Sequence, residues 1–201
     1  MLERARGNEP QITADLQQIA RDVSAEMAGL ENKFKAEESL TRKIAEGSVK
    51  NIRKLFESGY PLESSIEESV KIRAERNNDA LRYTFIFQFE KYVFGVKQSL
   101  QKLKQTGFEV SESKIWNAWK NIGMPFDKGY RGINITIISS RKQIFELQFH
   151  TGASYKLKTE THFLYEELRL LETSDERKDE IIRKLIETAQ AVKVPKGVKK
   201  L

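Results

Sequence analysis

Apolar positions recur at helical spacing towards both ends of the chain and alternate with polar positions in its middle. The spacing predicts helices over residues 13–34, 36–56, 90–105, 154–171 and 174–192. Stretches rich in β-branched and aromatic residues predict strands over 81–87, 108–111, 115–119, 133–138 and 145–151. The pattern therefore predicts an α+β fold, with a mixed sheet of about five strands flanked by helices.

Several residues predict where these elements begin and end. Thr13 and Ser174 are expected to cap the first and last helices. Gly47 interrupts the second helix and is a candidate break. Gly107 is expected to end the helix predicted over residues 90–105. The basic tail, residues 193–201, is expected to be frayed.

The last two predicted strands carry the most informative pattern. Successive side chains of a strand point to opposite faces. One face of the last strand is apolar, with Phe145, Leu147 and Phe149, and the other carries Glu146, Gln148 and His150. A polar row of this kind is either a solvent-facing surface or a reactive face, and the alternation alone leaves both interpretations open.

Composition narrows the classes of protein. The 201 residues include 35 basic and 29 acidic ones, so the net charge of +6 favours anionic partners such as nucleotides. Cysteine is absent and there are 2 histidines, which excludes disulfide frameworks, thiolate metal sites and histidine-rich metal sites. No apolar run approaches the roughly 20 residues that span a membrane. The polar start is unlike a secretory signal peptide, so we expect a cytoplasmic protein, or a fragment of a longer one.

Basic residues cluster where the second helix is predicted to start. Lys35, Ser39 and Lys43 are spaced four apart and are expected to share one helix face. Lys33 and Arg42 lie nearby, and no glycine-rich phosphate loop occurs anywhere in the chain. Such a face grips a polyphosphate, or is an ordinary solvated helix surface.

Two carboxylates lie close to predicted strands. Asp79 precedes the first strand together with Arg82, and Glu146 lies in the last strand. Magnesium prefers a few carboxylate oxygens combined with phosphate oxygens and water. This set of residues therefore suits a magnesium-bound nucleotide.

Four short motifs, in this order, resemble those of the RelA/SpoT-type (p)ppGpp synthetase domains. The family has R-x-K followed by S-x-x-x-K, then D-x-x-G-x-R, G-Y-R-S-x-H and E-x-Q-x-R-T. The matching segments here are residues 33–35 with 39–43, 79–82, 129–134 and 146–151. The resemblance covers about residues 30 to 165 and implies a nucleotidyltransferase-like fold. The chain is then a single domain over 1–201, with an N-terminal helical segment (1–30), a synthetase core (31–172), and a C-terminal helix with the basic tail (173–201).

The chain departs from the family pattern at four places. Lys33 replaces an arginine, and Asp79 lies three positions before Arg82 where the family has five. Asn134 replaces a histidine and His150 an arginine. The last two changes leave open which molecule accepts the transferred group and which product forms.

The resemblance implies transfer of the β,γ-diphosphate of ATP to the ribose 3′-hydroxyl of a purine nucleotide, giving (p)ppGpp or (p)ppApp. It implies that Asp79 and Glu146 hold Mg2+ and that Glu146 accepts the hydroxyl proton. ATP would contact Lys33, Lys35, Ser39, Arg42, Lys43 and Arg82. The acceptor would contact Lys128, Tyr130, Arg131, Asn134, Gln148 and His150, and further candidates are Glu160 and His162. Tyr130 as an aromatic plug and His162 as a packed histidine are the structural alternatives.

Three functional hypotheses remain at this point. The first is the synthetase itself, as a housekeeping enzyme or as an antibacterial toxin module. A synthetase whose product no hydrolase removes would drain ATP, which is why a toxin is considered. Such a toxin would act in a target-cell cytoplasm and have an immunity protein as partner. A second hypothesis changes the acceptor to the 3′ end of tRNA. A third is a catalytically silent domain of the same fold that binds nucleic acid or a partner.

Overall fold

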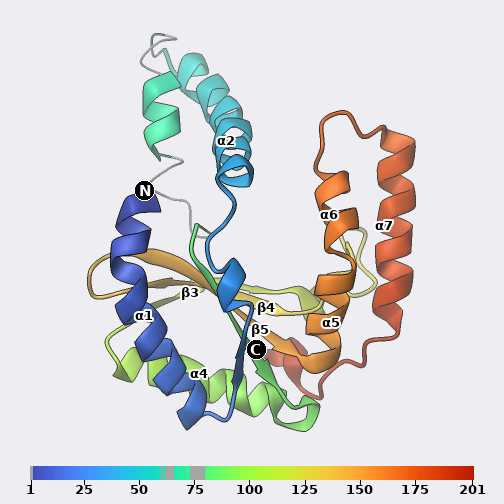
Figure 1. Cartoon of the computed structure of the whole chain (residues 1–201). Coiled ribbons are helices and arrows are strands. Elements are labelled where there is room, and N and C mark those ends of the chain that lie inside the picture. Colours follow the sequence, from blue (N-terminus) through green and yellow to red (C-terminus); the bar gives the residue numbers. More distant parts are fainter. Residues whose placement is uncertain (1, 60, 62–65, 73–79) are drawn as a thin grey trace.

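Five strands form one mixed sheet in the order β1-β2-β5-β4-β3 (Figure 1). The computed structural model describes residues 2–59, 61, 66–72 and 80–201. The strands are β1 (Glu26–Ala28), β2 (Arg82–Phe87), β3 (Glu109–Asn117), β4 (Ile133–Ile138) and β5 (Ile144–Thr151). Only the β2–β5 pair is parallel among these pairings. The predicted α+β fold with a mixed sheet of about five strands is confirmed.

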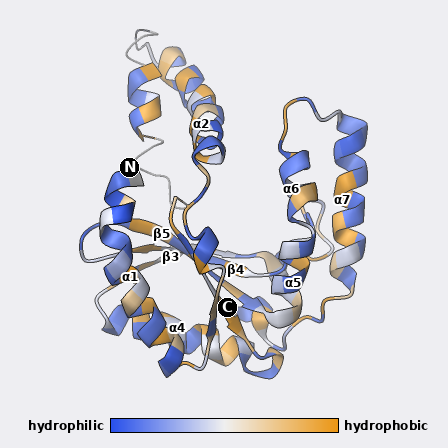
Figure 2. Cartoon of the chain, in the orientation of Figure 1, coloured by the Kyte–Doolittle hydropathy of each residue, from blue (hydrophilic) through white to orange (hydrophobic). Residues whose placement is uncertain are grey.

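The helices lie on both sides of this sheet. They are α1 (Leu2–Asp22), α2 (Glu37–Glu57), α4 (Tyr92–Gln105), α5 (Gly152–Glu160), α6 (His162–Leu168) and α7 (Asp175–Gln190). In Figure 1, α1 and α4 lie against one face of the sheet, whereas α2 rises from one end of the opposite face and α6 and α7 from the other end. Hydrophobic and hydrophilic residues alternate along α2 and α7 (Figure 2). Among the described helices, none is long and apolar enough to cross a membrane.

The two faces of the sheet differ in chemistry, as the alternation predicted. The apolar face packs on α1 and α4 and contributes Tyr83, Phe85, Phe87, Ile133, Ile135, Ile137, Phe145, Leu147 and Phe149 to the main core. On the other face, the strand register places Arg82 and Thr136 on either side of Glu146. Thr84 and Asn134 lie on either side of Gln148 in the same way. Buried apolar area stabilises one side of the sheet, so the other side is left to carry polar groups.

The N-terminal prediction was wrong in its boundaries. Helix α1 begins at Leu2, contains Pro10 and ends at Asp22, so Thr13 is not a cap. The Thr13 hydroxyl instead lies 2.8 Å from that of Tyr83, where it links the helix to the sheet. Residues 26–28 form β1, which pairs antiparallel with β2 instead of continuing the helix.

Other boundaries are closer to expectation. Strand β3 replaces two predicted short strands, with a register shift between Val110 and Ile115. Gly47 is buried within an unbroken α2. Gly107 follows α4 with φ +88°, and the side chain of Ser174 accepts a hydrogen bond from the N–H of Arg177, so both predicted helix ends are confirmed.

The basic tail is docked, contrary to the prediction of fraying. Val198 is fully buried in the main core, within the short helix η4 (Val198–Lys200). The side-chain amide of Asn117 donates to the carbonyl oxygen of Val198 at 2.8 Å. The same amide also donates to the carbonyl oxygen of Leu201 at 3.4 Å, and Leu201 packs against the main core. Apolar packing and hydrogen bonds to Asn117 therefore hold a segment that its basic charges had predicted to be frayed.

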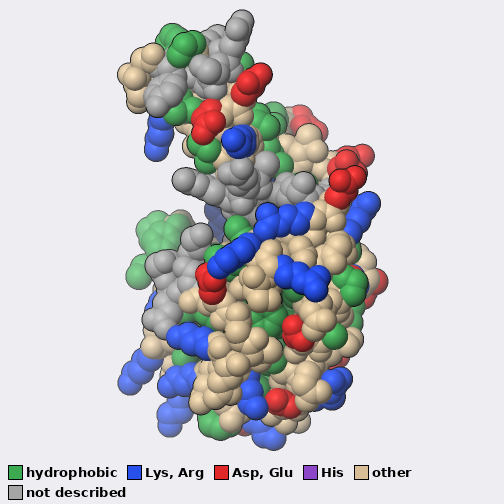
Figure 3. Space-filling view, turned by 90° about the vertical axis from the view of Figure 1, so that its left-hand side faces the viewer, with side chains coloured by type: hydrophobic (Ala, Val, Ile, Leu, Met, Phe, Trp, Pro, Cys, Tyr) green, Lys and Arg blue, Asp and Glu red, His purple; other side chains and the backbone are tan. Residues whose placement is uncertain are grey.

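Helix α2 projects from the body together with helical residues 66–72 (Figure 1). The hydroxyl of Ser69 donates to the carbonyl oxygen of Ser48 at 2.9 Å and joins the two. Figure 3 views this side of the molecule, where basic and acidic side chains are interspersed. The projection exposes the apolar residues Val49, Phe56, Ile66 and Val70.

Candidate active site

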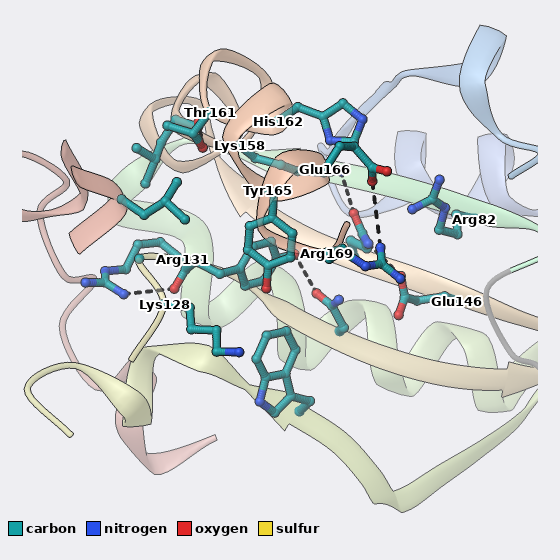
Figure 4. A pocket seen from close by; sticks show the side chains of 17 residues that line it. Arg82, Lys128, Arg131, Glu146, Lys158, Thr161, His162, Tyr165, Glu166 and Arg169 are labelled. Carbon is teal, nitrogen blue, oxygen red and sulfur yellow. Dashed lines mark hydrogen bonds and ion pairs between the residues drawn. The ribbon is translucent and has the colours of Figure 1, made fainter. Parts of the chain in front are cut away.

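A pocket of about 230 Å3 lies on the polar face of the sheet, beside α5 and α6 (Figure 4). Eight of the predicted site residues line it: Arg82, Lys128, Tyr130, Arg131, Asn134, Glu146, Gln148 and His162. Strands β2, β4 and β5 supply four of these eight side chains directly. The motifs that are far apart in sequence therefore meet at one place.

Glu146 belongs to a hydrogen-bonded row in which Gln148 is the central member. Gln148 donates from Nε2 to Oε1 of Glu146 at 2.5 Å, and Lys158 of α5 donates from Nζ to Oε1 of Gln148 at 2.6 Å. Arg82 is the register partner of Glu146 on the parallel neighbour β2. Burial, reinforced by the charge of Arg82 and opposed by that of Glu146, lowers the pKa of Lys158 to about 8.

Tyr130 forms an aromatic pair at the pocket wall. Its ring stacks on Trp116 with centroids 5.2 Å apart and an interplanar angle of 12°. Its hydroxyl donates to Oδ1 of Asn134 at 2.7 Å and lies 3.0 Å from Nε2 of His150. Trp116 itself is 45% exposed, so the pair presents an aromatic surface that a base can use.

His150 lies beneath this pair and does not line the pocket. It is fully buried, and its Nδ1 is 3.0 Å from the hydroxyl of Ser154. Burial, together with the charge of Lys158, lowers the pKa of His150 to about 3. The ring is therefore neutral at physiological pH, where the family pattern has a cationic arginine.

Gly132 leaves room for His150. A Cβ at this position would lie 2.8 Å from Cε1 of His150 and 3.0 Å from the hydroxyl of Tyr130. The family pattern has a serine here, so the glycine and the histidine depart from that pattern together.

Arg131 is held within the pocket wall by an ion pair. Its Nη1 and Nη2 donate to the two carboxylate oxygens of Asp127 at 2.8 Å and 3.1 Å, and both side chains are buried. Burial alone would raise the pKa of Asp127, but hydrogen bonds from Arg131 and the N–H of Gly129 keep it below its ordinary value. The charge of Arg131 is thus balanced within the turn.

The predicted ATP-binding segment lies beside β2. Phe34 bridges to Leu81, and the N–H of Arg82 donates to the carbonyl oxygen of Lys33 at 2.7 Å. Lys35 precedes α2, so the helix itself carries only Ser39 and Lys43 of the three residues expected to share its face. This pairing brings the basic segment to Arg82, and the strand register brings Arg82 to Glu146.

Five predicted ATP residues do not line the pocket itself: Lys33, Lys35, Ser39, Arg42 and Lys43. Lys33 forms an ion pair of 2.7 Å with Glu9. Arg42 reaches across from α2 to Glu166 of α6, with Nη2 2.9 Å from Oε2. Asp79 lies outside the described residues. Glu160 is exposed and 3.7 Å from Lys156, away from the pocket.

Several polar or aromatic lining residues were not anticipated: Trp116, Lys158, Thr161, Tyr165, Glu166 and Arg169. Trp116 is the register partner of Asn134, so strand pairing would have revealed it had the β3–β4 register been known. Lys158 directly follows the buried Leu157, and its direction depends on how α5 leaves β5. Only tertiary packing supplies that information.

The donor set for a metal is small in the described part of the chain. No group of three acidic or histidine side chains with metal-binding geometry occurs among the described residues. Among the described residues, the carboxylates of Glu146 and Glu166 both line the pocket. Glu166 is paired with Arg42, so Glu146 is the carboxylate to be combined with phosphate oxygens and water. That is a donor set that Mg2+ accepts when it arrives with a nucleotide, so the residues fit this ion.

Comparison with known proteins places the fold. No protein-family model and no curated protein sequence matches the chain. Among solved structures, the small alarmone synthetase 2 from Bacillus subtilis aligns over 94% of this chain and 88% of its own, with a TM-score of 0.54 and 16% identity. A complex between the Type VI effector Tas1 and its immunity protein aligns over 100% of this chain and 95% of its counterpart, with a TM-score of 0.53 and 16% identity.

A third similar structure is a GTP pyrophosphokinase family protein from Streptococcus pneumoniae, with a TM-score of 0.51 at 17% identity over 94% of this chain and 89% of its own. The chain therefore has the fold of alarmone synthetases. The RelA/SpoT-type synthetase fold that the four motifs predicted is confirmed.

Proposed function

We propose that this chain is an ATP-dependent pyrophosphokinase that transfers the β,γ-diphosphate of ATP to the ribose 3′-hydroxyl of a purine nucleotide. One observation carries the proposal: Glu146 and Arg82 lie side by side on neighbouring parallel strands, in the same pocket as Tyr130 and Lys128. A carboxylate between a basic side and an aromatic side suits a reaction that joins a polyphosphate to a nucleoside.

The basic side would hold ATP. Arg82 lines the pocket, and the segment that carries Lys33 and Lys35 is hydrogen-bonded to the start of β2. Arg42, Ser39 and Lys43 extend this side along α2. Phosphoryl transfer depends mainly on positioning and charge neutralisation, which these cations supply.

The aromatic side would hold the acceptor. A purine base can stack on the Tyr130–Trp116 pair, and Lys128 is an exposed cation at the same wall for the acceptor phosphates. His150 and Arg131 act from within the wall: one supports Tyr130, and the other fixes the turn through Asp127. Asn134 and Gln148 offer the polar atoms nearest to Tyr130 and Glu146.

Glu146 would accept the proton of the 3′-hydroxyl. The 3′ oxygen then attacks the β-phosphorus, the bond from that phosphorus to the α,β-bridging oxygen breaks, and AMP leaves. Glu146, together with Asp79, would also hold Mg2+, which when bound neutralises phosphate charge. His162 lines the same pocket as a further polar contact.

Labelled ATP with separate acceptors, resolved by thin-layer chromatography, tests this proposal. We expect a new labelled product with a guanosine or an adenosine nucleotide. A product only with the 3′ end of tRNA would move the acceptor assignment to nucleic acid. ATP turnover that yields ADP, or binding without turnover, would contradict pyrophosphate transfer.

A growth-inhibiting role is a second proposal, at the level of biology. It is supported by the fold shared with the effector Tas1, which was crystallised with an immunity protein. By the same likeness, an immunity protein is the partner we propose for this chain. Expression in a sensitive bacterium should stop growth for the parent chain and not for Glu146→Ala. Equal growth of the two strains would contradict the toxin role. The enzymatic activity would still be decided by the assay with labelled ATP.

A further inference from the structure

Lys158 lies in the pocket but outside all four motifs. It is half-buried on α5, and its ammonium group is 2.6 Å from Oε1 of Gln148. It also lies 5.6 Å from the centre of the Tyr155 ring on the same helix. Nothing in the motif resemblance gives it a role.

The contact determines how the Gln148 amide is oriented. An ammonium group only donates hydrogen bonds, so the amide oxygen must face Lys158. The amide nitrogen then faces Glu146 and donates to Oε1 at 2.5 Å. The reversed amide would place an NH2 group against an ammonium and a carbonyl oxygen against a carboxylate, and both contacts repel.

We propose that Lys158 is a positioning residue that fixes the amide of Gln148 and, through it, the carboxylate of Glu146. One oxygen of Glu146 is thereby tied down, which sets the plane of the carboxylate in the pocket. The kinetic consequences of this inference rest on the proposed function. The orientation of Gln148 does not.

The charges that face Lys158 are consistent with this role. Arg82 of β2 lowers its pKa and Glu146 of β5 raises it, while burial is the largest influence and brings the pKa to about 8. Lys158 in turn helps to keep His150 neutral. Other ionisable side chains of the same pocket are Lys128, Tyr130, Arg131, His162, Tyr165, Glu166 and Arg169. At pH 7 Lys158 is mainly protonated and holds the amide, and above pH 8 the ammonium is lost.

The first test observes Gln148 directly and needs no activity. The side-chain amide resonance of Gln148, assigned by its loss in Gln148→Met, should be that of a donor to a carboxylate. We expect Lys158→Met to move this resonance and Lys158→Arg to keep it. Lys156→Met is the matched control, because Lys156 is 74% exposed on the same helix. An unchanged resonance in Lys158→Met would overturn the proposal.

The second test uses AMP release. Loss of a residue that orients a catalytic group typically costs about 10- to 100-fold in activity, so we expect Lys158→Met to lower kcat by that factor with little change in the KM for ATP. We expect kcat/KM of the parent to fall above pH 8, as Lys158 loses its proton. Lys158→Arg should restore kcat and should lack this fall. In a Gln148→Met background, Lys158→Met should have no further effect.

The outcomes separate the two claims. A full additional loss in the Gln148→Met background, or an effect confined to KM, would mean that Lys158 binds phosphate directly, which contradicts positioning. Absence of AMP release by the parent chain would contradict the proposed function, and the resonance of Gln148 would still decide the role of Lys158.

Discussion

The hydroxyl of Tyr130 lies between Asn134 and His150, the two residues at which the third and fourth motifs depart from the family pattern. The two departures are thus joined by one side chain. Gly132 completes the unit, because a Cβ there would collide with both His150 and Tyr130. A neutral buried imidazole therefore supports the aromatic wall in this chain.

Gly132→Ala tests this packing. The new methyl group must displace His150 or Tyr130, so we expect a loss of about 1–3 kcal/mol in the free energy of unfolding, measured with urea. The loss should shrink when His150→Ala is added, because the cavity accepts the methyl group. Gly152→Ala is the control, since nothing lies within 4 Å of a Cβ there. Equal stability of Gly132→Ala and Gly152→Ala would contradict the packing.

The pKa of His150 makes a prediction about acid stability. Its folded-state pKa of about 3 lies below the ordinary 6.5, so below pH 6.5 the unfolded chain binds a proton that the folded chain refuses. Stability should therefore fall as pH drops from about 6.5 towards 3, by up to about 1.4 kcal/mol per pH unit from this group alone.

Urea unfolding at a series of pH values measures this dependence. The variant His150→Gln should have a shallower fall over the same range, whereas His162→Gln, at an exposed histidine, should keep the parent's slope. A parent-like slope in His150→Gln would show that other groups cause the acid loss.

At the scale of elements, local patterns succeeded where the pairing partner is near in sequence or the element is long. The alternation in β4 and β5 predicted both faces of the sheet, because each strand turns its own residues in and out. The prediction missed strand β1, because Met27, Leu30 and Phe34 also fit helical spacing. Its partner β2 begins at Arg82, far away in sequence, so no local pattern indicated the pairing. The prediction for the tail was wrong for the same reason, because its hydrogen-bond partner Asn117 is distant in sequence.

Replacement of Val198 tests the docked tail. Val198→Ala removes fully buried methyl groups from the main core, and we expect a loss of about 1–3 kcal/mol in the free energy of unfolding. Lys199→Ala, at an exposed neighbour, should change stability by less than about 0.5 kcal/mol. Circular dichroism in urea measures both, and a silent Val198→Ala would mean that the tail is frayed in solution.

The candidate site was predictable in part, again for a physical reason. Motif residues such as Arg82, Tyr130 and Glu146 have fixed places on strands or at turns, and the structure gathers them. Lys158 and Trp116 reach the pocket because of how α5 leaves the sheet and how β3 pairs with β4. Neither the direction in which α5 leaves the sheet nor the β3–β4 register can be deduced from a single sequence.

At the scale of the whole molecule, two helical walls face each other above the polar side of the sheet (Figure 1). Arg42 of α2 and Glu166 of α6 join them by an ion pair of 2.9 Å. Burial alone would raise the pKa of Glu166, but the hydrogen bond from Arg42 and the charges of Arg169, His162 and Arg42 hold it below its ordinary value. If Arg42 binds ATP, the nucleotide must compete with Glu166 for it.

Glu166→Gln tests this competition. Partly exposed ion pairs are worth about 0–1 kcal/mol, so we expect ATP to bind up to about five-fold more tightly to Glu166→Gln, measured by calorimetry. Arg42→Met should weaken binding. Glu167→Gln is the control, because Glu167 pairs with Arg177 of α7. Weaker ATP binding to Glu166→Gln would contradict a role for Arg42 in holding the nucleotide.

The most direct measurement is AMP release from ATP in the presence of Mg2+ and a purine nucleotide acceptor, for the parent chain and Glu146→Gln. The glutamine keeps the shape of the side chain but cannot accept the hydroxyl proton, so we expect a loss of about 100-fold or more. Glu109→Gln should keep parental activity, because Glu109 is an exposed residue of the outer strand β3 that pairs with Lys142. Acceptor-dependent AMP release that Glu146→Gln abolishes is the predicted result, and AMP release unaffected by Glu146→Gln, or absent from the parent, would contradict the account.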